Sequence, residues 1–349
     1  MRVETGLSGT FDAPSGGPVL TRIDEFAAAA RKIEELGFDG AAMAEVGHDP
    51  FLPLVIAAEH TQRIYLVPNV AIAFPRSPMV TAQMAWALQR YSGGRFRLGI
   101  GSQVKANNVR RYSTPWPAPP GRRLREYVLC LRAIFQSFQS SEPSYFHGQY
   151  YQFTMLQPAF NPGPIEHPHI PIEIGGVSPY MAHLAGELCD GFRPPGWVTS
   201  QYFKEVLLPS LEAGAHKAGR QLSDIELVGG GAIVTGKNER EVEAAKKQIK
   251  QLISFFGSTP SYHKVFAVHG WLDVGQKLHR MSQEGKWEEM PGLISDDMVE
   301  EFAVVGTHDE IVRKLKKRWD GVCTTLGLPH QTSEGDERVR AMIQELHQP

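Results

Sequence analysis

Two patterns of apolar and polar residues alternate along the chain. Short, mostly apolar runs are typical of strands buried on both faces, and the clearest run covers residues 64–74. Between these runs, apolar residues recur every three or four positions, which is the pattern of an amphipathic helix. Ser77-Pro78 shows how such a helix begins, with a capping residue and a proline in the first turn. Strands that alternate with helices over short connections predict parallel βαβ units.

The pattern predicts about eight strands, at residues 2–9, 38–45, 64–74, 95–101, 170–175, 191–193, 225–235 and 322–328. Helices are expected between Thr21 and Gly37, with Asp24 in the capping-box position, and at residues 53–60, 77–92, 179–188, 202–218, 239–256, 307–319 and 334–347. This count favours a closed (β/α)8 TIM barrel over an open doubly wound sheet. An open sheet that binds nucleotides usually carries GxGxxG near its first strand, and this sequence has none there.

A short repeat supports the barrel. Three predicted helices are each followed by Asp-Gly and a strand, at Asp39-Gly40, Asp190-Gly191 and Asp320-Gly321. Two longer segments interrupt the alternation. Residues 102–168 follow the fourth strand and contain a predicted helix, and residues 257–300, next to the seventh helix, are polar and irregular. Long segments at the carboxyl ends of barrel strands usually shape the active site.

Composition narrows the class of protein. A chain of 349 residues has room for two domains or for one large barrel, and the strand count assigns residues 1–349 to a single barrel domain. The 36 Lys and Arg nearly balance the 38 Asp and Glu, which argues against a nucleic-acid partner. The three cysteines are far apart, so neither a disulfide framework nor a zinc site is expected. Without a signal-peptide or membrane-spanning run, we expect a cytoplasmic protein with no membrane partner.

Candidate chemistry lies where the predicted strands end. Glu45 and His48 follow the second strand. The imidazole of His48 can carry a proton near neutral pH, whereas Glu45 is either a site residue or an ion-pair partner. Asn69 lies inside an apolar strand, where a buried amide must either tie strands together or contact a ligand. No GxSxG, Walker or HExxH motif is present, and no metal site is expected.

A glycine turn leads into the helix after the fifth strand. Gly175-Gly176-Val177-Ser178 places free N–H groups at a helix start, where a phosphate binds well. The alternative is a tight turn with a serine cap. The aromatic residues between Tyr145 and Phe160, and loop tryptophans such as Trp197, either line an apolar pocket or pack the loops. The first of these alternatives predicts a small apolar or aromatic substrate.

Several motifs, in this order, resemble the bacterial luciferase-like superfamily. They are GFDGAAMAE, LVPNVAIAFPRSPMVTAQMAWALQRYSGGRFRLGIGS, IPIEIGG and FAVVGTHDEIVRKL. The nearest branch is similar to the coenzyme F420-dependent (deazaflavin) oxidoreductases. The resemblance implies a (β/α)8 barrel with the cofactor at its C-terminal mouth. The ring would rest on a bulge at Asn69-Val70, often a non-prolyl cis peptide, and the phosphate on Gly175, Gly176 and Val177. Asn107 falls where relatives place an asparagine that contacts the cofactor, and Gly101 and Gln103, where strand four ends, complete the expected cofactor contacts.

The sequence also departs from this pattern. Deazaflavin relatives often carry Asp-His after the second strand, where this chain has Glu45-Val46, and a Glu after the fourth, where it has Val104. His48 would then replace the usual proton donor, with Glu45 beside it. The expected function is an oxidoreductase that moves hydride between F420 and a small organic substrate. The alternatives are a monooxygenase that uses reduced FMN and a non-catalytic cofactor-binding barrel. The resemblance also implies a homodimer formed through the early barrel helices.

Overall fold

The computed structural model describes residues 1–7, 11–12, 17–18, 22–116, 119–140, 142 and 144–348. Parallel strands form a ring in the order β5-β4-β1-β15-β12-β11-β10-β7-β6. Their bounds are β1 (Arg2–Gly6), β4 (Gly40–Met43), β5 (Tyr65–Pro68), β6 (Ala71–Ile72), β7 (Leu98–Gly101), β10 (Ile172–Gly175), β11 (Gly191–Arg193), β12 (Glu226–Gly229) and β15 (Thr325–Gly327).

The segments β5 and β6 are two halves of one interrupted strand. β4 pairs with β5 and β7 pairs with β6, while a bridge between Leu66 and Phe96 also joins β5 to the strand that leads into β7. The ring therefore closes with eight strands, which confirms the predicted TIM barrel. The break corrects the continuous strand that the apolar run of residues 64–74 predicted.

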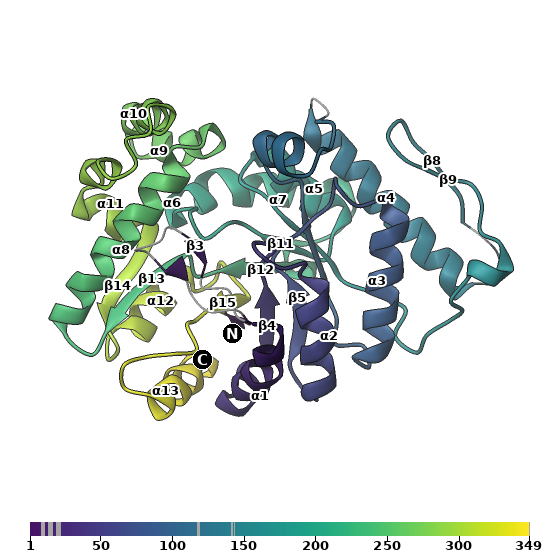
Figure 1. The fold of residues 1–349 in the computed structure, drawn as a ribbon, viewed down its shortest axis with the longest axis horizontal. Coiled ribbons are helices and arrows are strands. Elements are labelled where there is room, and N and C mark those ends of the chain that lie inside the picture. The colour runs from purple at the N-terminus through teal and green to yellow at the C-terminus, as the bar shows by residue number, and fades with distance from the viewer. Residues whose placement is uncertain are drawn as a thin grey trace.

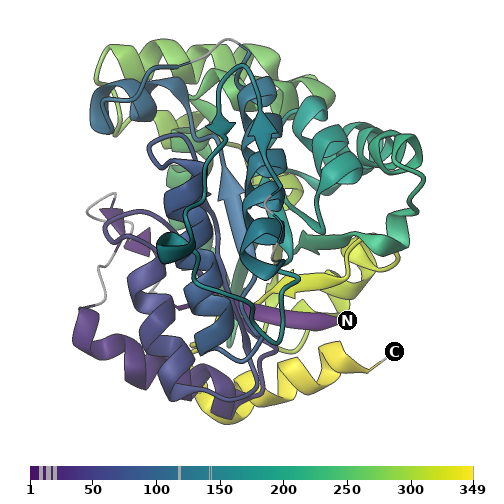
Figure 2. The same ribbon diagram turned by 90° about the vertical axis from the view of Figure 1, so that its right-hand side faces the viewer.

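Helices surround the ring (Figure 1, Figure 2). They are α1 (Phe26–Leu36), α2 (Phe51–His60), α3 (Pro78–Tyr91), α4 (Pro120–Gln139), α5 (Pro179–Leu188), α6 (Ser200–Tyr202), α7 (Leu208–Lys217), α12 (Ile311–Trp319) and α13 (Asp336–His347). The predicted start of α3 is confirmed, since Ser77 Oγ accepts a hydrogen bond from the Val80 N–H at 3.2 Å. None of the helices in the described ranges is long and apolar enough to cross a membrane.

Short elements fill the connections between these helices and strands. They are β2 (Phe11–Asp12), β3 (Gly17–Pro18), β8 (Phe146–His147) and β9 (Gln152–Phe153), with η1 (Ile23–Glu25), η2 (Asn107–Arg111), η3 (Pro158–Phe160), η4 (Phe203–Leu207), η5 (Leu222–Asp224), η6 (Pro260–Tyr262) and η7 (Met290–Leu293). The first helix starts differently from the prediction. Thr21 lies outside the described residues, as do residues 8–9 of the predicted first strand. Glu25, rather than Asp24, accepts the N–H of Arg22, at 2.9 Å.

A helical lobe, defined here as residues 239–302, stands beside the barrel (Figure 1). It contains α8 (Glu239–Gly257), α9 (His263–Val268), α10 (Leu272–Gln283) and α11 (Asp296–Phe302). Residues 257–300 are thus mostly helical, which corrects the irregular segment predicted there. The predicted strand at 225–235 is two strands: β12 in the ring, and β13 (Ala232–Gly236), which pairs with β14 (Ala303–Thr307).

Buried charges cross the inside of the barrel. Arg193 on β11 is entirely buried and donates to both carboxylate oxygens of Glu4 on β1, at 2.8 and 2.9 Å. It also pairs with Glu173 on β10, which in turn meets Arg97. Burial opposes the ionised form of Glu4, but the charge and hydrogen bonds of Arg193 hold its pKa below the ordinary value. The ion pairs tie strands that are distant in sequence to one another.

Candidate active site at the C-terminal mouth of the barrel

Val70 lies among the strand ends that form the mouth of the barrel. The peptide bond Asn69-Val70 is cis, as the resemblance implied, and the Asn69 N–H donates to the Met43 carbonyl at 2.7 Å. A Cβ added at Gly101 would lie 2.7 Å from Val70 Cγ2, and one added at Gly175 would lie 3.1 Å from Val70 Cγ1. The ends of three strands thus meet around one side chain. We call Val70, Gly101 and Gly175 the valine cradle.

The glycine turn after β10 is fixed on several sides. Gly175 pairs with Gly101 and with Arg193 in the neighbouring strands. A Cβ at Gly176 would lie 2.5 Å from Met181 Cβ, so the start of α5 can approach this closely only because residue 176 is glycine. The predicted serine cap is present, since the Met181 N–H donates to Ser178 Oγ at 3.3 Å. The glycine backbone of this turn therefore lies at the N-terminus of α5, where the helix dipole favours an anion.

Glu45 is held in a cluster of ion pairs. Its carboxylate accepts from Arg76 at 2.8 and 3.0 Å, from the Ile72 N–H at 2.7 Å and from the Tyr112 hydroxyl at 3.2 Å. Only 5% of the Glu45 side chain is exposed. Burial and the nearby Glu45 charge raise the pKa of Tyr112, so its phenol stays protonated and donates. Of the two roles expected for Glu45, this geometry is that of an ion-pair partner.

The structure places His48 beside the first helix. Its ring meets the Phe26 ring edge-on, with centroids 5.7 Å apart, and the side chain is half-buried. The neighbouring Asp49 caps α2, because its Oδ1 accepts the Phe51 N–H at 2.9 Å, and its Oδ2 also accepts from Arg76 at 2.6 Å. Histidine and carboxylates therefore surround the end of β4, but the carboxylates already hold Arg76.

The loop after β7 is held by Asn108, a residue that nothing in the sequence singles out. Gln103 has a φ of +56°, and its Oε1 accepts from the Val104 N–H at 2.9 Å. Asn108, entirely buried, donates to the carbonyls of Ser102 and Val104 at 2.8 and 3.1 Å, which leaves its Oδ1 buried without a partner among the described residues. Asn107, the predicted contact, opens η2 and is only half-buried. Two adjacent asparagines give no sequence signal for which of them is buried.

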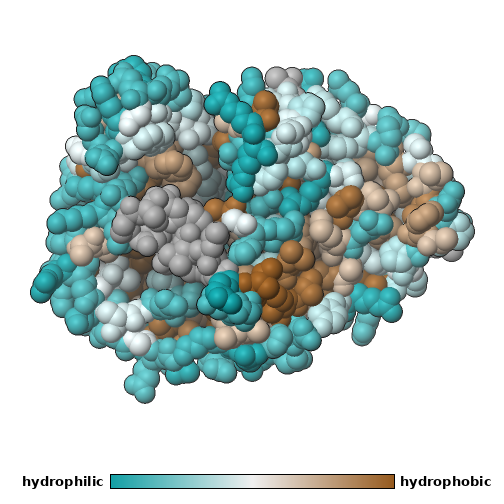
Figure 3. Space-filling view, viewed as in Figure 1, coloured by the Kyte–Doolittle hydropathy of each residue, from teal (hydrophilic) through white to brown (hydrophobic). Residues whose placement is uncertain are grey.

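The aromatic residues around the barrel divide into two groups. The segment from Tyr145 to Phe160 packs on α4, where Tyr151 meets Tyr127 edge-on at 5.3 Å, and it runs across the outside of the helices in Figure 2. It therefore does not support the predicted contribution to a substrate pocket. Trp197, by contrast, lies just after β11 and stacks on Phe256 of α8, with ring centroids 4.6 Å apart. In the space-filling view the surface is hollowed between the helical lobe and the barrel (Figure 3).

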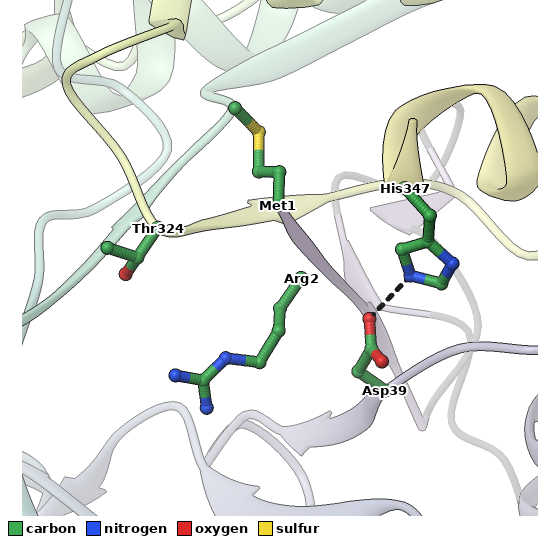
Figure 4. A pocket seen from close by; sticks show the side chains of 5 residues that line it. All are labelled: Met1, Arg2, Asp39, Thr324 and His347. Atoms are coloured by element: carbon green, nitrogen blue, oxygen red, sulfur yellow. Dashed lines mark hydrogen bonds and ion pairs between the residues drawn. The ribbon is translucent and has the colours of Figure 1, made fainter. Parts of the chain in front are cut away.

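A different pocket lies at the opposite end of the barrel. Met1, Arg2, Asp39, Thr324 and His347 line it, and His347 bonds to Asp39 at 2.8 Å (Figure 4). The amino ends of barrel strands serve stability rather than catalysis, so the mouth remains the candidate active site. In the described parts of the chain, no group of three or more His, Cys, Asp or Glu residues could hold a metal ion.

Comparisons with known proteins agree with this fold. A family model described as luciferase-like monooxygenase matches residues 1–324. An uncharacterized protein of Mycobacterium tuberculosis is 40% identical over 330 residues, which cover 95% of this chain and 96% of that protein. A putative coenzyme F420-dependent oxidoreductase of the same organism is 28% identical over 335 residues, covering 90% and 92% of the two chains. The solved structure of a coenzyme F420-dependent tetrahydromethanopterin reductase from Methanopyrus kandleri has a TM-score of 0.77 at 21% identity, over 99% of this chain and 97% of that one, and so shares the fold.

Proposed function

Because the chain belongs to the luciferase-like monooxygenase family, we propose that it is an F420-dependent oxidoreductase that moves hydride between the deazaflavin and a small organic substrate. The valine cradle carries the proposal. It brings the predicted bulge at Asn69-Val70 against the two glycines that end the fourth and fifth strands, so closely that a Cβ at either glycine would press on Val70. The 28% identical relative, named as F420-dependent, supports the same cofactor.

The chain's own residues would bind and orient the cofactor. Asn69 and Val70 would support the ring, and Gly175, Gly176 and Val177 would bind the phosphate at the start of α5. Gln103 and Asn107 would complete the site from the loop after β7. The deazaflavin supplies the redox chemistry when bound, while the protein contributes orientation and exclusion of water. We assign the proton donor or acceptor to His48, because Glu45 is already paired with Arg76.

Binding titrations test the cofactor assignment. We expect F420 to bind the purified protein more tightly than FMN does, as followed by cofactor fluorescence. Gly101→Ala should weaken F420 binding, because its Cβ would displace Val70. Gly292→Ala is the matched control, since its Cβ would meet no atom within 4 Å and its φ is ordinary. Tighter binding of FMN, or equal F420 affinity in the two variants, would contradict the proposal.

A reduced-FMN monooxygenase is the second candidate. The family description names monooxygenases, and a glycine turn at a helix start accommodates the phosphate of FMN as well as that of F420. Oxygen consumption in the presence of reduced FMN, together with a hydroxylated product, would support this candidate against the first one.

We also propose the character of the substrate and the assembly. Trp197 stacked on Phe256 would form an apolar wall between the mouth and the lobe, which suits an apolar or aromatic molecule. The helices α1 and α2 would pair two copies of the chain, since α2 exposes apolar side chains such as Leu52.

A further inference from the structure

Tyr202 contacts the backbone of the glycine turn. Its side chain is 1% exposed, and its hydroxyl donates to the Val177 carbonyl at 2.9 Å. Burial raises the pKa of Tyr202 to about 12, so the hydroxyl remains a donor throughout the working pH range. The contact joins two connections at the mouth that are more than twenty residues apart in sequence, the turn after β10 and the loop after β11.

Holding one carbonyl also orients the next amide. In a trans peptide, the C=O of one residue and the N–H of the following residue point in opposite directions. Among the described residues, Asn69-Val70 is the only cis bond, so Val177-Ser178 is trans. With its carbonyl bound to Tyr202, Val177 therefore turns the Ser178 N–H away from α6. A phosphate at this turn depends on where such N–H groups point.

Thr199 connects Tyr202 to the helical lobe. It is fully buried and caps α6, its Oγ1 accepting the Tyr202 N–H at 3.2 Å. The same oxygen lies 2.9 Å from Nε2 of His269, which follows α9 and stacks on Trp271 with ring centroids 4.5 Å apart. A continuous series of contacts thus runs from the lobe to the turn: His269, Thr199, Tyr202, Val177.

We propose that Tyr202 is a positioning residue for the cofactor phosphate, and that Thr199 and His269 hold it in place from the helical lobe. The inference rests on the proposed function, because the phosphate is that of the bound cofactor. A hydroxyl that acts through the turn should affect binding of the phosphate and leave binding of the ring at the valine cradle unchanged.

The test compares two ligands in Tyr202→Phe, which removes the hydroxyl and keeps the ring. The ligands are F420 and its 5-deazariboflavin chromophore, which lacks the phosphate, and binding is followed by fluorescence. We expect F420 affinity to fall about fivefold, the effect of one ordinary hydrogen bond, while affinity for the chromophore stays constant. Tyr127→Phe is the matched control, because it removes another buried hydroxyl, bonded to Thr81 at 2.6 Å, and should change neither affinity.

The outcomes separate the inference from the function. If the unmodified protein binds neither F420 nor the chromophore, the proposed function fails. If the unmodified protein binds both ligands, the function stands. The positioning role is then wrong if Tyr202→Phe binds each ligand as tightly as the unmodified protein does, or if it loses the same affinity for both. His269→Leu provides a second variant that leaves Tyr202 intact. It should reduce F420 affinity in the same direction without changing chromophore affinity, and an unchanged F420 affinity would remove the lobe from the proposal.

Discussion

Glu45 shows how a residue's neighbours change its role. The sequence leaves two roles open for it, a site residue or an ion-pair partner, because a carboxylate at the end of a barrel strand suits both. In the structure it binds Arg76 through both oxygens and also accepts the Ile72 N–H, which belongs to the strand segment just after the cis peptide. Glu45 therefore fixes the bulge on which the cofactor ring is proposed to rest.

We expect Glu45→Gln to destabilise the fold. A neutral amide has one acceptor for the two Arg76 nitrogens and leaves a half-buried guanidinium with less compensation, which costs about 3 kcal/mol in the free energy of unfolding. Urea denaturation followed by circular dichroism measures this cost. Glu284→Gln, at an exposed pair with Lys286, should leave the urea midpoint unchanged. Equal midpoints for both variants would show that the Glu45 pair contributes no net stability.

The buried charges inside the barrel could not be predicted from the sequence. Glu4, Glu173 and Arg193 occur singly in short strands, and nothing local marks them as different from polar residues on a solvent-facing side. They become partners only when the ring closes, since Glu4 and Arg193 are 189 residues apart. The glycine turn at the mouth was easier to predict, because glycines just before Ser-Pro indicate a turn that leads into a helix.

At the scale of elements, local signals predicted some bounds well. Residues 179–188 and 191–193 were predicted as they are found, because a serine cap with proline begins α5 and the Asp190-Gly191 turn follows it. The strand predicted at 225–235 was wrong because Gly230 and Gly231 have φ of +108° and +60°, which turn the chain out of the ring. Apolar periodicity alone does not reveal such a turn.

The Asp-Gly repeat has a structural cause at two of its three positions. Asp39 Oδ2 accepts the Val3 N–H at 2.7 Å, and Asp190 Oδ2 accepts the Ile172 N–H at 2.8 Å. In both cases the aspartate after a helix binds the start of the strand before that helix, which closes a βα unit. Asp320 instead accepts the N–H of its own neighbour, Gly321.

Asp190 should therefore contribute stability that is lost in acid. Burial opposes its ionisation, but the hydrogen bond from His169 and the charge of Arg132 lower its pKa from 3.8 to about 2. The contribution, about 2 kcal/mol, is complete above pH 4 and disappears as the pH falls through 2.

The variant Asp190→Asn tests this pH dependence. The unfolding midpoint of the unmodified protein should decrease between pH 4 and pH 2 more steeply than that of the variant. Asp320→Asn, at the exposed member of the repeat, should follow the unmodified protein. Parallel curves for all three proteins would contradict the assignment.

At the scale of the whole molecule, the mouth divides into two sides. The proposed cofactor contacts come from the third, fourth and fifth strands, which are neighbours in the ring. The helical lobe contributes on the other side, where its Phe256 stacks on Trp197 and its His269 contacts Thr199. The cofactor is thus proposed to lie on the barrel. The lobe, inserted after the seventh strand, would hold the phosphate turn through His269 and shape the substrate's side of the site through Phe256.

An apolar surface lies on the outer side of the early barrel helices. Leu52 and Val55 on α2 are 56% and 43% exposed, and Val80 on the adjacent α3 is 46% exposed. Figure 3 shows the apolar patch over α2. A contiguous exposed patch of this kind marks an interaction surface in proteins that otherwise bury such side chains. The patch lies on the early barrel helices, which are proposed to pair two copies of the chain.

We expect a dimer at micromolar concentration, measured by size-exclusion chromatography with light scattering. The double variant Leu52→Glu with Val55→Glu should be a monomer, because a two-fold interface would bring four added carboxylates together without partners. Met155→Glu is the control, since Met155 is 68% exposed but lies in the segment packed on α4, and this variant should remain dimeric. A monomeric unmodified protein would contradict the proposed dimer, and a dimeric double variant would place the interface on another surface.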